Sequence, residues 1–187
     1  MSRINLKLLA RKYPWLLPVL CEIASSGITE SVFGRSMVAS RLNISSKLAH
    51  TIFYMLTKLG LLEKVSEGLF KLTDMGRNIC RSLYRLMREG CYHKFRGVYY
   101  VLELDDSFIY SHVKSSRITG RYIPKQTVNM VLNLLKDSRN RVWSVQELSR
   151  ILDVNPEIVS NVVFILELKG IVEVVSVKPK RFKIRGA

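Results

Sequence analysis

An internal repeat limits the folds that this sequence can adopt. When Gly60 is aligned with Gly170, the apolar positions on both sides coincide without a gap. A shared glycine and a shared order of apolar sites are hard to obtain by chance, so we expect two copies of one structural unit. The aligned pairs are Val38 with Leu148, Leu42 with Leu152, Ile44 with Val154, Leu48 with Ile158, Ile52 with Val162, Met55 with Ile165, Leu56 with Leu166, Leu61 with Ile171 and Val65 with Val175.

Each copy shows the same local pattern of helices, a turn and a β-hairpin. The turn ends in a residue that can cap the next helix, Ser45 in the first copy and Asn155 in the second. Gly60 and Gly170 can end that longer helix, because glycine readily adopts the left-handed conformation found at helix C-termini. We therefore expect helices at 15–25, 35–42 and 46–59 with strands at 61–65 and 69–72, and helices at 125–135, 145–152 and 156–169 with strands at 171–175 and 181–185.

The residues between the copies are expected to join them. Ile79, Leu83 and Leu86 recur at helical spacing and predict a helix over 74–89. A β-branched and aromatic run predicts one strand over 97–104, and the stretch after it shows no clear pattern. The chain then divides into an N-terminal domain over 1–90, a linker over 91–123 and a C-terminal domain over 124–187. The helix over 74–89 could pack between the two units or pair with its counterpart in a homodimer.

Two motifs carry a resemblance to a known superfamily. Leu59-Gly60-Leu61-Leu62-Glu63, followed by Leu69-Phe70-Lys71-Leu72-Thr73-Asp74-Met75-Gly76, resembles the winged helix-turn-helix regulators of bacteria and archaea. The second copy repeats the first motif at residues 169–173 but lacks the Leu-Thr-x-x-Gly that follows. The resemblance implies a mainly α fold with small β wings (α+β), in which two winged helix-turn-helix units are joined by a helical and partly extended linker.

The charge balance points to a polyanionic partner. The chain has 30 Lys and Arg against 15 Asp and Glu, a formal net charge of +15. Nucleic acid is the first candidate, an anionic membrane the second and solubility alone the third. The apolar stretches are far shorter than the roughly 18 residues of a membrane-spanning helix, and no signal-peptide pattern is visible. We expect a cytoplasmic, nucleoid-associated protein that binds double-stranded DNA and no membrane.

The longer helix of the first copy is the leading candidate for base recognition, because the resemblance places such a helix in the major groove. Removing its expected core positions leaves an outward face of hydrogen-bonding and cationic side chains, with no acid between Ser36 and Leu62. A merely solvated helix surface is the alternative interpretation. The candidate DNA-binding residues are Ser46, Lys47, His50, Thr51, Tyr54 and Lys58.

The second copy offers a weaker helix and a basic hairpin. Its longer helix is expected to expose Glu157, Ser160, Asn161 and Glu167, and carboxylates facing phosphate cost affinity. Asn161 is kept as a candidate, because asparagine can pair with adenine. The alternative interpretation is that the positive charges of the hairpin only keep the edge of the sheet from pairing with other chains. Its candidate backbone contacts are Lys178, Lys180, Arg181 and Lys183.

No catalytic, metal or cofactor site is expected. The three histidines, His50, His93 and His112, share no metal-ligand spacing, and Asp105-Asp106 is typical of a turn. The three cysteines lack a C-x-x-C spacing, and we expect two core thiols and one loop thiol.

Three functions remain open at this point. The leading hypothesis is a transcription regulator that binds duplex DNA with some sequence preference. An architectural chromosome protein would coat DNA without base readout. A protein adaptor of the transcription or chromosome-segregation machinery would use the winged helices, above all the C-terminal unit, to bind protein.

Overall fold

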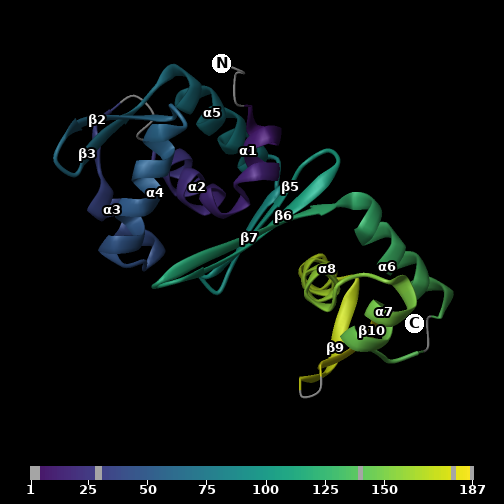
Figure 1. Ribbon diagram of the computed structural model, residues 1–187. Coiled ribbons are helices and arrows are strands. Elements are labelled where there is room, and N and C mark those ends of the chain that lie inside the picture. Colours follow the sequence, from purple (N-terminus) through teal and green to yellow (C-terminus); the bar gives the residue numbers. More distant parts are fainter. Residues whose placement is uncertain (1–4, 28–30, 139–140, 178–179, 186–187) are drawn as a thin grey trace. The chain divides into compact units, whose positions relative to one another are not determined.

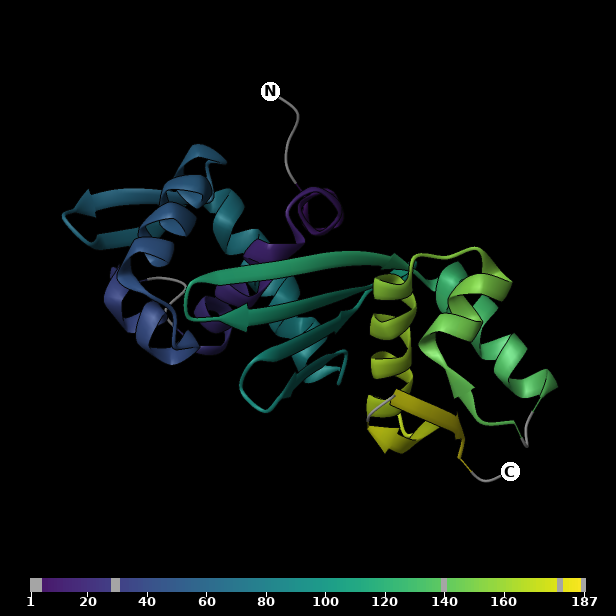
Figure 2. The same ribbon diagram turned by 60° about the horizontal axis from the view of Figure 1, so that its bottom comes forward.

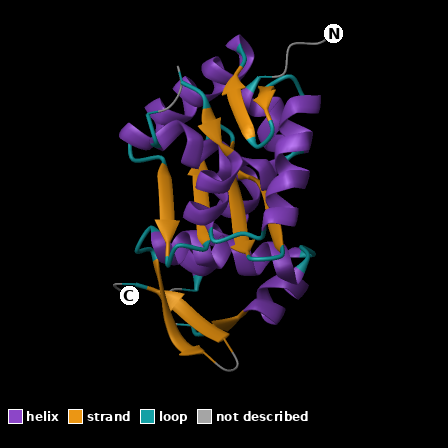
Figure 3. Ribbon diagram, turned by 90° about the vertical axis from the view of Figure 1, so that its left-hand side faces the viewer, coloured by secondary structure: helices purple, strands orange, loops and turns teal. Residues whose placement is uncertain are grey.

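The computed structural model describes residues 5–27, 31–138, 141–177 and 180–185, and it is an α+β protein. Contacts between residues divide the chain into two compact units, Met1–Tyr122 and Ile123–Ala187. Figures 1 and 3 show helices and short antiparallel sheets in both units.

The first unit begins with helices and ends with a sheet. Its elements are α1 (Leu6–Lys12), the 3-10 turn η1 (Pro14–Leu16), α2 (Leu17–Ser25), β1 (Phe33–Gly34), α3 (Arg35–Leu42), α4 (Ser46–Lys58), β2 (Leu62–Ser66), β3 (Leu69–Leu72), α5 (Asp74–Arg88), β4 (Tyr92–Phe95), β5 (Tyr99–Glu103), β6 (Ser107–Lys114) and β7 (Arg117–Pro124).

The second unit repeats the order from α2 to β3. Its elements are α6 (Lys125–Asp137), β8 (Trp143–Ser144), α7 (Val145–Leu152), α8 (Pro156–Leu168), β9 (Val172–Val177) and β10 (Lys180–Ile184). The predicted bounds of α3 and α7 are those observed, and the bounds of the other predicted elements differ by a few residues at most.

The two copies also share sheet topology and turn conformations. The strand orders are β1-β3-β2 and β8-β10-β9, and Phe33 pairs with Phe70 as Trp143 pairs with Phe182. After α3 and α7, one residue in each copy adopts a left-handed conformation, Asn43 at φ 52° and Asp153 at φ 51°. These turns fix the direction in which α4 and α8 leave.

Helix α2 is the centre of the first unit. Every residue from Leu17 to Ala24 is buried, so the helix must be covered on all sides. Helices α3 and α5 and strand β6 provide that cover. Its only charged residue, Glu22, accepts a hydrogen bond from Lys94 of β4 at 2.6 Å, which compensates the buried carboxylate.

Helix α5 belongs to this core. Ile79, Cys80 and Leu83 are buried on its inner face, where it packs on α2. The sequence left open packing between the units and pairing in a homodimer; the observed packing of α5 on α2, inside the first unit, is neither of these, and the homodimer stays a prediction.

Residues 91–123 form a four-stranded antiparallel sheet with the order β4-β5-β6-β7, where the sequence predicted a linker with one strand. Strand β6 does not alternate between apolar and polar residues, because side chains on both of its faces are buried: adjacent Phe108 and Ile109 are an example. Gly120 and Pro124 in β7 are also typical strand breakers. The sheet joins the first unit, since Ser111 donates to the Pro14 carbonyl at 3.2 Å.

The Leu-Thr-x-x-Gly motif ties the end of α4 to the start of α5. The Thr73 hydroxyl donates to the Gly60 carbonyl at 2.6 Å and accepts from the Gly76 amide at 3.1 Å. A Cβ on Gly76 would lie 2.1 Å from the Leu61 carbonyl oxygen, so only glycine fits this approach.

We expect Gly76→Ala to destabilise the protein by about 2–3 kcal/mol, because the clash with backbone outweighs the ~1 kcal/mol that alanine gains in a helix. Gly34→Ala is the matched control: its Cβ would lie 3.6 Å from Ser36 Oγ, an ordinary contact. Urea unfolding of both variants measures the difference. Equal midpoints for Gly76→Ala and wild type would contradict the packing described for Thr73 and Gly60.

Candidate nucleic-acid interface

Helix α4 is fixed by its inner face. Ala49, Ile52, Phe53 and Leu56 are buried, and the Ser45 hydroxyl accepts from the Leu48 amide at 3.2 Å to cap the helix. The Phe53 ring makes edge contacts with two other aromatic rings, Phe33 of β1 at 6.3 Å and Phe70 of β3 at 4.8 Å between centroids. The sequence predicted the core positions Leu48, Ile52, Met55, Leu56 and Leu59. Ala49 and Phe53 were not among them, although both follow the helical spacing of Ile52 and Leu56. Three packed rings therefore hold the helix on its sheet.

The outer face of α4 carries the predicted residues. All six are exposed, and Tyr54 keeps 62% of its surface accessible. The Thr51 hydroxyl donates to the Lys47 carbonyl at 3.2 Å, and its oxygen can still accept a hydrogen bond. The structure therefore brings Ser46, Lys47, His50, Thr51, Tyr54 and Lys58 together on the exposed side of one helix.

One residue of this surface was missed by the sequence analysis. Arg35, at the start of α3, donates to His50 Nδ1 at 2.8 Å and lies 4.0 Å from a Glu67 carboxylate oxygen in the β2–β3 turn. Its backbone amide also donates to the Gly68 carbonyl at 2.9 Å. The sequence feature that could have indicated Arg35 is its position in the stretch without acidic residues. Arg35 thus links the hairpin tip to the outer face of α4.

The β2–β3 hairpin itself is close to charge-neutral. Lys71 pairs with Glu63 at 3.3 Å and Lys64 pairs with Glu67 at 2.8 Å. The hydrogen bond from Lys64 holds the pKa of Glu67 below its ordinary value. The hairpin cations are therefore partly compensated, whereas α4 contains no acid at all.

The prediction that Asn161 is exposed was wrong. Asn161 keeps only 8% of its surface accessible. Helix α8 differs from α4 in being apolar on most of its circumference, with Val159, Val162 and Val163 all buried. A helix of this kind is buried on more than one side, so its polar residue is buried as well. Asn161 is not available for base contact in this arrangement.

The hairpin of the second unit is less cationic than its sequence indicates. Lys180 pairs with Glu167 of α8 at 3.3 Å, and Lys183 pairs with Glu173 of β9 at 3.1 Å. Arg181 is exposed. Lys178, the remaining predicted contact, lies outside the described residues. Of the predicted residues here, Arg181 is the one that the structure presents to solvent without a competing acid in its described contacts.

The described residues offer little for other chemistry. Within the ranges that the structure covers, no three His, Cys, Asp or Glu side chains are grouped so as to hold a metal ion. Cys21 and Cys80 are buried and Cys91 is half-buried, as expected. Burial raises the pKa of the Cys80 thiol to about 12, which keeps it protonated and unreactive.

No family model matches this chain, and no curated protein matches it. In the part of the chain that the structure describes, no helix is long and apolar enough to cross a membrane. The candidate interface therefore rests on the residues of the chain itself.

Proposed function

We propose that this protein binds double-stranded DNA as a tandem winged helix-turn-helix protein. Each unit supplies the order helix, strand, helix, helix and hairpin, in which α4 and α8 occupy the place of the recognition helix. The first unit makes the main contact, with α4 in the major groove and the β2–β3 hairpin beside the backbone. A regulator of transcription is the function that this arrangement suits best.

The outer face of α4 is the observation that carries the proposal. Six exposed polar or cationic side chains lie on a helix whose position is fixed by packed aromatic rings. A major groove about 12 Å wide admits an α-helix, and rigid placement is what base readout requires. Sequence positions 31–62 contain no acid, so nothing on this segment repels phosphate.

The residues on that face divide into two roles by their chemistry. Lys47 and Lys58 suit phosphate, which sets position and affinity. Thr51, Tyr54 and His50 suit base edges, and His50 is oriented by the hydrogen bond from Arg35. The second unit adds backbone affinity through Arg181, while its paired lysines contribute less.

We expect the chain to bind random-sequence duplex with a steep salt dependence. Lys47→Ala should reduce the slope of log K against log salt by about 0.9, the value for one phosphate contact. Fluorescence anisotropy at several salt concentrations measures the slope. Arg88→Ala is the matched control, because Arg88 is an exposed cation on α5. An absence of wild-type binding at low salt would rule out DNA as the partner.

A second measurement distinguishes a transcription regulator from an architectural chromosome protein. Selection from a random duplex library should enrich a motif, and Thr51→Ala should change that motif at one or two positions, since base contacts specify and phosphate contacts do not. Lys47→Ala should weaken binding evenly and keep the motif. If wild type enriches nothing, the protein coats DNA without readout and the architectural function replaces the regulatory one.

A protein contact through the second unit is the other candidate function, and the exposed edge strand β9 favours it. Val175 and Val177 of that strand keep 53% and 76% of their surfaces accessible. Strand β9 is last in the order β8-β10-β9, so one of its sides is open to pairing. A second copy of the chain is the simplest occupant.

Sedimentation velocity across a range of protein concentrations tests this pairing. We expect a dimer that Val177→Lys dissociates, because a lysine on the strand opposes edge pairing. Arg150→Ala, a change of an exposed residue on α7, serves as the control. A monomer at all concentrations would argue against self-association.

A further inference from the structure

The β6–β7 hairpin reaches the start of α4. The Ser45 amide, directly before the helix, donates to the Ser115 carbonyl in the β6–β7 turn at 2.7 Å. Figure 2 shows the long hairpin extending to the α3–α4 region. Two segments that are 70 positions apart in the sequence therefore meet where α4 presents its first exposed residues.

The tip of this hairpin is exposed and cationic. Lys114 and Arg117 flank the turn, with Ser115 and Ser116 between them, and all four are exposed. Positions 107–136 contain no acid. Burial, and then the charges of Lys114 and Arg117, hold the pKa of His112 below its ordinary value. The tip thus maintains a positive potential that its own strands do not neutralise.

The hairpin is held by the core as well as by α4. A Cβ on Gly120 of β7 would lie 2.4 Å from the Trp15 amide nitrogen, so β7 lies directly against η1. Ser111 of β6 bonds to the Pro14 carbonyl, and the Val113 amide donates to the Val98 carbonyl at 2.8 Å. A tip positioned in this way loses little freedom when it binds.

We propose that the β6–β7 tip is a second contact of the first unit with the same DNA duplex, in which Lys114 and Arg117 bind phosphates on the rim of the groove that α4 enters. This inference rests on the proposed function. The occupant is a phosphate backbone because the tip is cationic, lies beside α4, and joins one acid-free stretch to another.

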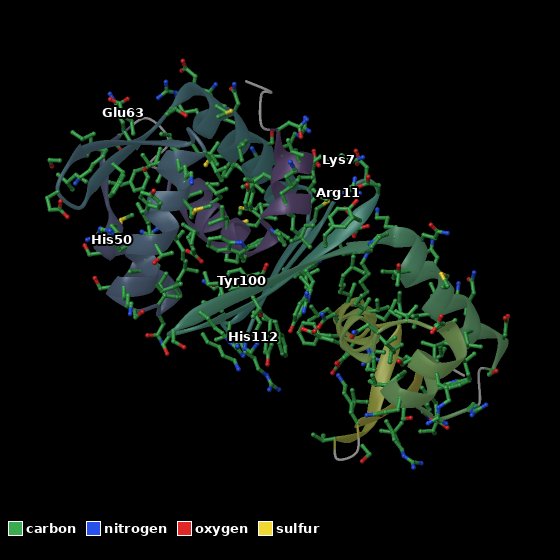
Figure 4. The ribbon with its side chains drawn as sticks, viewed as in Figure 1. Lys7, Arg11, His50, Glu63, Tyr100 and His112 are labelled. Carbon is green, nitrogen blue, oxygen red and sulfur yellow. The ribbon has the colours of Figure 1, made fainter. Side chains whose placement is uncertain are left out.

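Two cations of α1 serve as a matched control for the cations of the tip. Strand β6 has eight residues and spans roughly 25 Å. Lys7 of α1 pairs with Asp106 just before the start of β6, whereas Lys114 ends that strand. In Figure 4, Lys7 and Arg11 lie toward one end of the sheet and His112 toward the other. Arg11, labelled there, and Lys12, which follows it in α1, are both exposed cations.

The experiment is a salt titration of the full chain with labelled random-sequence duplex. Lys114→Ala/Arg117→Ala should reduce the slope of log K against log salt by about 1.8, two phosphate contacts, and weaken binding at least about tenfold near 0.1 M salt. Arg11→Ala/Lys12→Ala removes the same charge and should change the slope by less than about 0.5. Both pairs are exposed, and unchanged thermal unfolding confirms that both variants are folded.

A direct readout comes from His112. A duplex phosphate at the tip should raise the pKa of His112, because a nearby anion favours the imidazolium form. An NMR titration of the ring protons with and without duplex measures this change, and Lys47→Ala at saturating duplex should leave it in place.

The outcomes separate the two proposals. If wild type fails to bind duplex, both the proposed function and the hairpin contact are overturned. If wild type binds and Lys47→Ala reduces the slope, but the Lys114/Arg117 variant behaves like its control, only the hairpin contact is overturned. If the slope change appears with single-stranded oligonucleotide and not with duplex, the stacked Tyr99 and His112 rings mark a single-strand surface and the duplex assignment is wrong.

Discussion

The complete burial of α2 is the constraint on which the first unit depends. A helix that is apolar around its whole circumference gains stability only when every side is covered, at roughly 25 cal/mol for each Å² removed from water. Helix α3 covers one side of α2, α5 another and the β4–β7 sheet a third. The one charge on the helix, Glu22, is compensated by Lys94 from that sheet. The sheet is therefore part of the core and not an appendage, and its hairpin is positioned by the same packing.

Helix α6, the counterpart of α2, explains why the second unit is smaller. In α6 the buried residues Val128, Val131 and Leu135 lie on one face only. An amphipathic helix needs cover on that face alone, and α7, α8 and β10 provide it. Two copies with the same order of elements thus differ in what surrounds them, because one leading helix is apolar throughout and the other is not. The extra layers of the first unit follow from this difference.

The sequence predicted those helices and turns that depend on residues close together along the chain. Gly60 and Gly170, the caps at Ser45 and Asn155, and the spacing of Ile52 and Leu56 act within a few residues, so the helices and turns could be located. The β4–β7 sheet could not be located, because β6 is apolar on both faces and Gly120 of β7 is typical of a strand break until its contact with η1 is known. The burial of Asn161 and the bond from Arg35 to His50 depend on which elements pack together, and spacing along the chain carries no such information.

The distribution of charge argues for a polyanion more strongly than its total. If the net charge of +15 served solubility alone, cations would be spread evenly and paired wherever acids were near. The second unit follows that pattern, with Lys180 and Lys183 both paired. In the first unit, the bond between Ser45 and Ser115 brings two acid-free stretches together and concentrates like charges at the start of α4. Such a concentration raises the free energy of the folded chain by self-repulsion, and the phosphate backbone of the proposed DNA partner would relieve that repulsion.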